Sequence, residues 1–112
     1  MAELKEIFRE IDEALSADPS RLNGLEAVYQ FDLHGEEAGS YQIVLRGENS
    51  YVAEGGDEKP DCILKMASED FEKMVEGSLN GTQAFMSGKL KLQGNMGLAL
   101  KLQGVLAAYR TV

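Results

Sequence analysis

The sequence predicts an α+β domain in which a five-stranded, mixed and mainly antiparallel sheet carries helices on one face. Three observations support this fold. A helical pattern opens the chain, three short strand-like segments follow in succession, and the remainder alternates strand-like with helix-like segments up to an apolar C-terminal helix. Strands and helices that are segregated in this way form layers around one core. With 112 residues, of which 44% are hydrophobic, residues 1–112 are expected to form a single domain.

The first element is an amphipathic helix over residues 3–16. Its apolar residues recur every three or four positions, which places them on one helix face. The helix ends before Asp18-Pro19, because the residue before a proline avoids the helical conformation. The apolar face consists of Leu4, Ile7, Phe8, Ile11 and Leu15.

Three strands are expected next, over residues 27–33, 41–46 and 50–54. Each is short and bounded by turn residues, and the first turn spans residues 34–39. Apolar and polar residues alternate along the first strand, so one side of it is expected to face the core. That side consists of Ala27, Tyr29, Phe31 and Leu33. Three strands joined by short turns predict an antiparallel meander.

Residues 55–60 form a polar crossover to a fourth strand over residues 61–66, and a second helix follows. Ser68 is predicted to be the N-cap of this helix, with acidic residues in the first turn, where the helix dipole favours them. Gly77 is expected to end it. Its predicted inner face consists of Phe71, Met74 and Val75.

A short helix, a fifth strand and a last helix complete the expected fold. Thr82 is predicted to cap the short helix, which stops at Gly88. In residues 89–93, Leu90 and Leu92 alternate with Lys89, Lys91 and Gln93, so the leucines are expected to face inward. Asn95 is predicted to cap the final helix.

The final helix is apolar around nearly its whole circumference. On a helical wheel, Gly97, Lys101, Gly104 and Ala108 form the one stripe suited to water. A surface helix needs an apolar arc of only about 100°, so this helix is expected to be buried, to line a cavity or to meet a partner. Gln103 lies on the inner side, where its amide needs a hydrogen-bond partner. That partner is either a ligand head group or a backbone carbonyl or water.

The charge is divided unevenly along the chain. Residues 1–76 carry 7 basic and 19 acidic side chains, a net charge of −12, whereas residues 77–112 carry 4 basic and no acidic side chains, or +4. The total of −8 argues against a nucleic-acid partner, which favours basic surfaces. Lys89, Lys91 and Lys101 either form a solvated face or attract a carboxylate, a phosphate or an anionic membrane surface.

Residues suited to catalysis or metal binding are sparse. His34 is the single histidine and Cys62 the single cysteine, so the sequence supports neither a histidine-based triad nor a zinc site with two histidines. We expect no catalytic residues, no metal and no cofactor, and therefore no enzyme. Without a run of about 18 apolar residues or a secretion signal, the expected location is the cytoplasm.

The second half resembles the sterol carrier protein 2 family. The resemblance lies in residues 60–71, 80–85 and above all 88–103, which read GKLKLQGNMGLALKLQ. It implies a sheet and helices that enclose a hydrophobic tunnel for sterols, fatty acids, fatty acyl-coenzyme A or phospholipids, without covalent chemistry. Many eukaryotic relatives end in a peroxisomal signal, but this chain does not, which indicates a stand-alone, bacterial-type version.

The resemblance implies non-enzymatic binding and intracellular transfer or presentation of lipids. One alternative is a protein-interaction or dimerisation module that uses the apolar last helix, and another is an accessory domain of a lipid-metabolising enzyme. Expected partners are a lipid ligand and, transiently, an anionic membrane surface or lipid-metabolising enzymes. A monomer is expected, with a dimer as the alternative. The expected ligand-binding residues are Phe71, Met74, Val75, Phe85, Met86, Leu90, Leu92, Met96, Leu100, Gln103 and Leu106.

Overall fold

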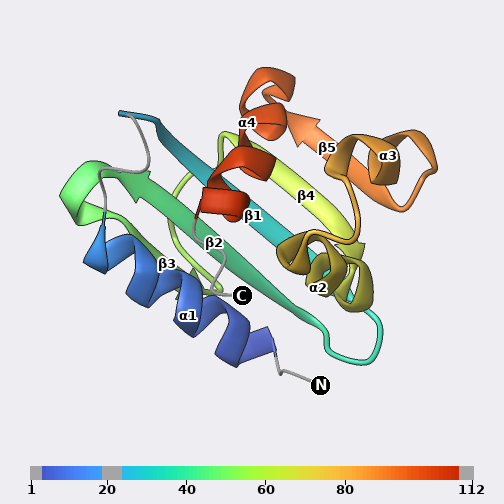
Figure 1. The fold of residues 1–112 in the computed structure, drawn as a ribbon, viewed down its shortest axis with the longest axis horizontal. Helices are drawn as coiled ribbons and strands as arrows, with labels where there is room; N and C mark the ends of the chain where they lie inside the picture. The colour runs from blue at the N-terminus through green and yellow to red at the C-terminus, as the bar shows by residue number, and fades with distance from the viewer. Residues whose placement is uncertain (1–3, 19–23, 109–112) are drawn as a thin grey trace.

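A computed structural model describes residues 4–18 and 24–108 of the chain, with the backbone alone described at residue 103 and residues 105–108. Helices α1, α2 and α4 lie over one face of a five-stranded sheet, and α3 lies near the edge strand β5 (Figure 1). The predicted α+β fold, with helices packed on a mixed sheet, is therefore confirmed.

The sheet has the strand order β3-β2-β1-β4-β5. Its strands are β1 (Glu26–His34), β2 (Gly39–Arg46), β3 (Tyr51–Glu54), β4 (Cys62–Ala67) and β5 (Leu90–Gly94). The β1–β4 pair is parallel and the other pairs are antiparallel. The meander and the crossover to a fourth strand lie where the sequence predicts them. Buried and more exposed side chains alternate along β4, whereas five consecutive residues of β2 are buried.

The helices also follow the predicted order. They are α1 (Leu4–Ala17), α2 (Ser68–Glu76), α3 (Gly81–Met86) and α4 (Met96–Ala108), and a short 3-10 turn, η2 (Gly47–Asn49), precedes β3. Gly77 ends α2 in the left-handed conformation with φ of 90°, as predicted. Glycine reaches this conformation without the steric cost that a Cβ atom imposes.

Ser68 is not the N-cap of α2, and that prediction is wrong. The N-cap is Ala67, which makes no side-chain capping bond, and Ser68 is the first helical residue. The Ser68 hydroxyl is buried and accepts a hydrogen bond from the backbone N–H of Glu37 at 3.4 Å. The serine therefore ties α2 to the β1–β2 turn instead of closing the helix end.

The cap of α3 also differs from the prediction, whereas the cap of α4 is confirmed. The N-cap of α3 is Asn80, whose side-chain oxygen accepts a hydrogen bond from the backbone N–H of Thr82 at 2.8 Å. Thr82 already lies inside the first turn, where it cannot act as the N-cap. In α4, the Asn95 side chain accepts a hydrogen bond from the N–H of Leu98 at 3.1 Å.

An aromatic cluster joins α1 and α2 to the sheet. Phe8 of α1 stacks on Tyr41 of β2 with ring centres 4.1 Å apart, and on Phe71 of α2 at 4.9 Å. Phe71 meets Phe31 of β1 edge-on at 5.1 Å. These four side chains are buried, so the cluster is a solid part of the core.

The crossover between β3 and β4 sets the starting point of α4. The carbonyl of Asp61 accepts a hydrogen bond from the N–H of Asn95 at 3.0 Å. Gly94 has φ of 99°, and a Cβ atom there would lie 2.4 Å from the same carbonyl oxygen. Because only glycine fits this close approach, Gly94 fixes the path by which β5 leads into α4.

Candidate functional site

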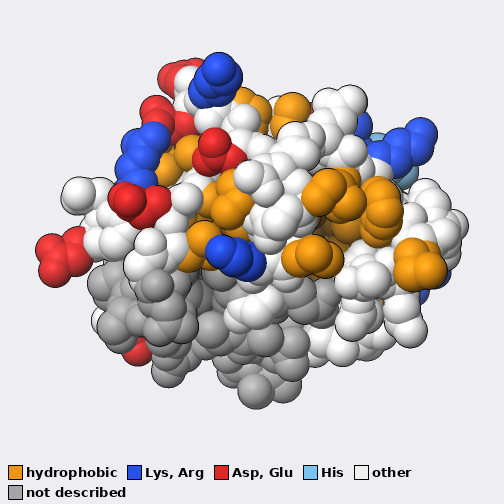
Figure 2. Space-filling view, turned by 90° about the horizontal axis from the view of Figure 1, so that it is seen from above, with side chains coloured by type: hydrophobic (Ala, Val, Ile, Leu, Met, Phe, Trp, Pro, Cys, Tyr) orange, Lys and Arg blue, Asp and Glu red, His pale blue; other side chains and the backbone are white. Residues whose placement is uncertain are grey.

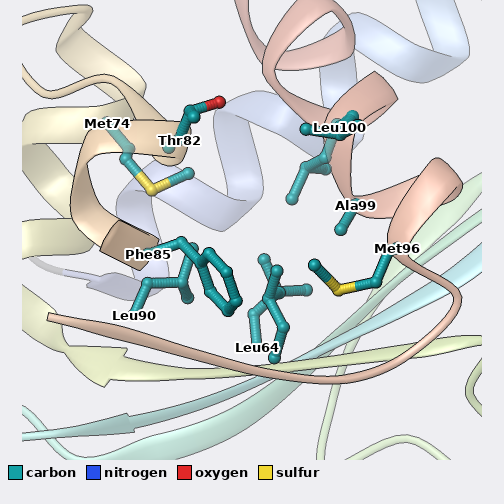
Figure 3. Close-up of a pocket in the computed structure, with 11 residues that line it drawn as sticks. Leu64, Met74, Thr82, Phe85, Leu90, Met96, Ala99 and Leu100 are labelled. Atoms are coloured by element: carbon teal, nitrogen blue, oxygen red, sulfur yellow. The ribbon is translucent and has the colours of Figure 1, made fainter. Parts of the chain in front are cut away.

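An apolar pocket of about 60 Å³ lies between β4, β5 and helices α2, α3 and α4 (Figure 3). Leu64 comes from the sheet, Phe85 from α3, and Met96 from the start of α4, and Figure 3 shows the three side chains converging on one space. The complete lining is Leu64, Met74, Gly81, Thr82, Phe85, Leu90, Leu92, Met96, Ala99, Leu100 and Leu102.

Several of the residues expected from the sequence to bind a ligand meet at this pocket. They come from four separate elements that are up to 26 residues apart in the chain (from 74 to 100), and the fold brings them together. Their role in binding a ligand stays a prediction. These residues are Met74, Phe85, Leu90, Leu92, Met96 and Leu100.

The other expected ligand-binding residues do not lie in the described pocket. Phe71 is fully buried in the aromatic cluster, and Val75 is half-buried against the core. Met86 follows Phe85 by one helical position, points elsewhere and is 80% exposed. The side chains of Gln103 and Leu106 lie outside the described part of the structure.

The pocket also contains residues that the sequence analysis does not single out. Leu64 alternates with the buried Cys62 and Met66 along β4, so strand periodicity could have indicated it. Ala99 and Leu102 are three positions apart on α4 and share one helix face. Gly81 and Thr82 belong to the first turn of α3, where no pattern of apolar residues marks them.

The exposed side of helix α4 is wider than the predicted stripe. Gly97, Lys101 and Gly104 are exposed as expected, and Ala108 lies beyond the described side chains. However, Met96 and Leu100, which were expected on the inner side, are 47% and 66% exposed. Leu102 is the deeply buried residue instead. Met96 and Leu100 consequently lie at the mouth of the pocket.

Two buried polar side chains of the sheet hold the first turns of α4. The Tyr29 hydroxyl on β1 donates a hydrogen bond to the Leu98 carbonyl at 2.6 Å, and the Cys62 thiol on β4 donates to the Asn95 carbonyl at 3.6 Å. Burial is the main cause that raises the pKa of Tyr29, followed by the nearby Cys62 and Asp61. Burial and Asp61 also raise the pKa of the Cys62 thiol. A thiol with a raised pKa is a poor nucleophile. We therefore assign Cys62 a structural role, in which its hydrogen bond to Asn95 holds the start of α4.

The buried Tyr29 predicts a loss of stability in alkali. The unfolded tyrosine ionises near its usual pKa of 10.0, whereas the folded one stays protonated to higher pH. Stability is therefore complete below the unfolded pKa and falls as the pH rises towards the folded pKa, by at most about 1.4 kcal/mol per pH unit for this group. Tyr29→Phe should lower the free energy of unfolding by about 1 kcal/mol at neutral pH, yet make it decline less steeply above about pH 10.

Urea unfolding at neutral pH and at about pH 11 measures this difference. The matched control is Tyr51→Phe, which removes the hydroxyl of an exposed tyrosine on β3 but keeps Tyr29, so it should retain the alkaline loss of stability that Tyr29 causes. Parallel pH profiles for the wild-type and Tyr29→Phe proteins would contradict the anchoring role of the Tyr29 hydroxyl.

The described lining of the pocket contains no charged side chain. Thr82 contributes a hydroxyl group at the exposed end of α3. Lys101 is exposed on α4, and Lys89 is exposed just before β5. Lys91 lies between Leu90 and Leu92 on β5, so it points to the opposite face of the sheet and is not placed to reach a head group at the pocket.

The described residues offer neither a metal site nor a helix that spans a bilayer. Within residues 4–18 and 24–108, no three His, Cys, Asp or Glu side chains come together as possible metal ligands. None of the helices in this part of the chain is long and apolar enough to cross a membrane.

The sequence model of the SCP-2 sterol transfer family matches residues 4–107. The chain belongs to this family. The predicted resemblance is therefore confirmed, and SCP-2 membership supports lipid binding or transfer in general. Rat hydroxysteroid dehydrogenase-like protein 2 is 41% identical over 104 residues, a match that covers 92% of this chain and 20% of the rat protein. The SCP-2 chain thus spans about a fifth of that relative's length.

Solved structures of SCP-2 proteins share the fold. Sterol carrier protein 2 from Yarrowia lipolytica, in its apo form, superposes with a TM-score of 0.79 at 25% identity, covering 95% of this chain and 91% of that one. Sterol carrier protein domain 2 of Helicoverpa armigera has a TM-score of 0.76 at 30% identity, covering 95% and 87%. The arrangement of sheet and helices is therefore that of the SCP-2 fold.

Proposed function

We propose that this SCP-2 chain binds the hydrocarbon part of a sterol, fatty acid, fatty acyl-coenzyme A or phospholipid in the pocket between the sheet and α4, and carries or presents it without changing it chemically. The observation that carries the proposal is the lining of the pocket, which consists of apolar side chains, a glycine and Thr82. Removing apolar ligand surface from water contributes about 25 cal/mol per Å².

The pocket must enlarge to accept such a ligand. A water molecule needs roughly 10–15 Å³ of such space, so about 60 Å³ accommodates a few waters, whereas sites for drug-sized ligands measure about 300 Å³ or more. Met74 and Met96 line opposite sides of the pocket and have flexible, unbranched side chains that can repack around a guest. We infer that the tunnel implied by the family forms as the ligand enters.

The absence of charge from the described lining determines where the head group lies. A charged carboxylate or phosphate would be costly to bury there, so it stays at the solvent-exposed mouth. The Thr82 hydroxyl can hydrogen-bond to a ligand oxygen at that position. Affinity then comes from the hydrocarbon chain, at about 0.8 kcal/mol for each buried methylene group.

Displacement of a fluorescent fatty-acid probe by unlabelled fatty acids of increasing length tests the proposal. Saturable binding is expected, and the affinity should rise by roughly fourfold for each added methylene group until the pocket is full. Native mass spectrometry of gently purified protein checks for a lipid that is already bound. Absence of both a bound lipid and saturable probe binding would refute the proposed function.

A second candidate function is presentation of a lipid to a catalytic partner. It is favoured by one observation: the chain corresponds to about a fifth of hydroxysteroid dehydrogenase-like protein 2, whose name describes a dehydrogenase-like protein. Transfer of a labelled lipid between vesicles without any enzyme would support the carrier. Transfer that requires an added lipid-metabolising enzyme would favour the accessory role.

A further inference from the structure

The two edges of the sheet differ in how they are protected. At the β3 edge, helix α1 contacts the strand, and the Asp12 side chain accepts a hydrogen bond from the backbone N–H of Val52 at 2.8 Å. An unpaired edge offers a row of N–H and C=O groups to any strand that approaches it, and this contact occupies one of them. Strand β5 forms the other edge of the sheet and is paired with β4. Of the two edges, β5 is therefore the one at which the sheet can be extended.

Every second residue of β5 turns its backbone N–H and C=O groups away from β4. The N–H of Asn95 donates to the carbonyl of Asp61 at 3.0 Å, so these two residues form a hydrogen-bonded pair. Hydrogen-bonded and non-hydrogen-bonded pairs alternate along an antiparallel ladder. In the register of β4 and β5, the outward groups then belong to Leu90, Leu92 and Gly94. Among the described residues, the outward groups of Leu90 and Leu92 have no hydrogen-bond partner.

Lysines lie at this edge on the sheet face opposite the helices. Lys91 of β5 is directly opposite Lys65 of β4, both are exposed, and like charges in this position repel each other. Asp32 of β1 is next to Lys65 in register, but its carboxylate already accepts hydrogen bonds from Ser40 and Gln30. Neither lysine forms an ion pair with a described residue. A carboxylate on a strand added beside β5 lies next to Lys91 on its open side.

The face of this edge that is turned towards the helices is apolar. Leu90 and Leu92 line the pocket together with Phe85 of α3 and Met96 of α4, which are 41% and 47% exposed. Figure 2, seen from the top of Figure 1, shows a group of apolar side chains on its right and the visible acidic side chains on its left. Because successive side chains of a strand point to opposite faces, the strand that matches this edge alternates acidic with apolar residues.

We propose that β5 accepts an extended segment of a partner protein as a sixth strand, and that acidic residues alternate with apolar ones in this segment. Hydrogen bonds to the outward backbone groups of β5 supply affinity, and the alternating side chains supply specificity. A second copy of the chain is a less suitable occupant, because its own β5 brings lysine to the same sheet face. The inference goes beyond the proposed function, since it requires no lipid in the pocket.

Titration with synthetic peptides tests the strand addition. The probe is an acetylated and amidated peptide in which glutamate alternates with valine over about seven residues, and its charge control carries lysine in place of glutamate. Saturable binding of the acidic peptide is expected, with the lysine peptide at least about fivefold weaker. In the complex, the amide hydrogens of Leu92 and Gly94 should exchange with solvent more slowly, as measured by NMR. Unchanged exchange at both amides would overturn the inference.

Lys91→Glu should reverse the preference between the two peptides. The acidic peptide should bind at least about fivefold more weakly than to wild type, and the lysine peptide more tightly. The substitution places opposite charges side by side at Lys65, so the fold should keep its stability. Lys5→Glu on α1, which contacts the β3 edge, is the matched control and should stay within about twofold of wild type. An equal loss of acidic-peptide affinity in both variants would show attraction by total charge and overturn the inference.

Methylation of the peptide's backbone nitrogens separates strand pairing from attraction between side chains. In an added strand, alternate N–H groups point to β5 and the others to solvent. Methylating the nitrogens of all valines, or instead those of all glutamates, should abolish binding in one peptide and spare it in the other. Acidic-peptide binding that survives both methylations would overturn strand addition. A wild-type dimer in sedimentation, with the Leu92 and Gly94 amides already protected from exchange, would assign the edge to a second copy and likewise overturn the inference.

Discussion

Ala99→Trp is expected to weaken binding of the fatty-acid probe at least tenfold. Ala99 is half-buried on α4 and points into the pocket beside Met96 (Figure 3). An indole ring at this position occupies the space of about 60 Å³ that a ligand has to enter. A tenfold loss corresponds to about 1.4 kcal/mol, which is the contribution of about two buried methylene groups, so blocking even a small part of the chain suffices.

Gly104→Trp provides the matched control, because it adds the same side chain to the exposed stripe of α4. A Cβ atom at Gly104 has no neighbouring atom within 4 Å, so the indole can remain in solvent. Probe titration gives the affinity of each variant, and urea unfolding checks that Ala99→Trp is folded despite an overpacking cost of about 1–3 kcal/mol. An unchanged probe affinity in folded Ala99→Trp would show that the ligand lies elsewhere.

The strands could be predicted from the sequence because one side of each faces a core. Along β1, Ala27, Tyr29, Phe31 and Leu33 are all buried, and a shift of one residue would turn all four outward. Burial therefore imposes a period of two that is visible in the sequence. The glycine at the end of α2 was equally readable, because Gly77 adopts a conformation that favours glycine.

The inner face of α4 could be predicted only in part. A helix that is apolar all round offers no polar face to define its outside, so the wheel placed Leu100 on the inner side. Its rotation is determined instead by contacts that are distant in sequence, such as the hydrogen bond from Tyr29 to the Leu98 carbonyl, 69 residues apart. Leu100 is 66% exposed, so a large side chain substituted there can extend into water. A large side chain at Ala99 instead points into the pocket, which makes Ala99 the better position to block it.

Pocket lining and solid core also look alike in sequence. Phe71 and Met74 are one helical turn apart on the inner face of α2, and both are buried. Phe71 nevertheless meets the aromatic rings of α1 and β1, whereas Met74 lies nearer α3 and borders the pocket. The difference depends on how far each neighbouring element approaches α2, which no local pattern records.

Phe71→Ala is therefore expected to lower the free energy of unfolding by about 3–5 kcal/mol. The Phe71 side chain is 0% exposed and contacts Phe8 and Phe31 at ring distances of 4.9 and 5.1 Å. Truncation leaves a cavity in the joint between α1, α2 and the sheet, where the close-packed neighbours cannot fully collapse. Because a domain is stable by only about 5–15 kcal/mol, urea unfolding should detect this loss as a large fall in the midpoint.

Met74→Ala on the same helix face separates core from pocket. Met74 is also buried, at 3% exposure, but it borders space that already exists, so its truncation should cost less stability than that of Phe71. Of the two variants, Met74→Ala should show the larger change in probe affinity, and Phe71→Ala the larger fall in the free energy of unfolding. If folded Phe71→Ala alters probe affinity more than Met74→Ala does, Phe71 contacts the ligand, and the pocket extends into the aromatic cluster once a lipid is bound.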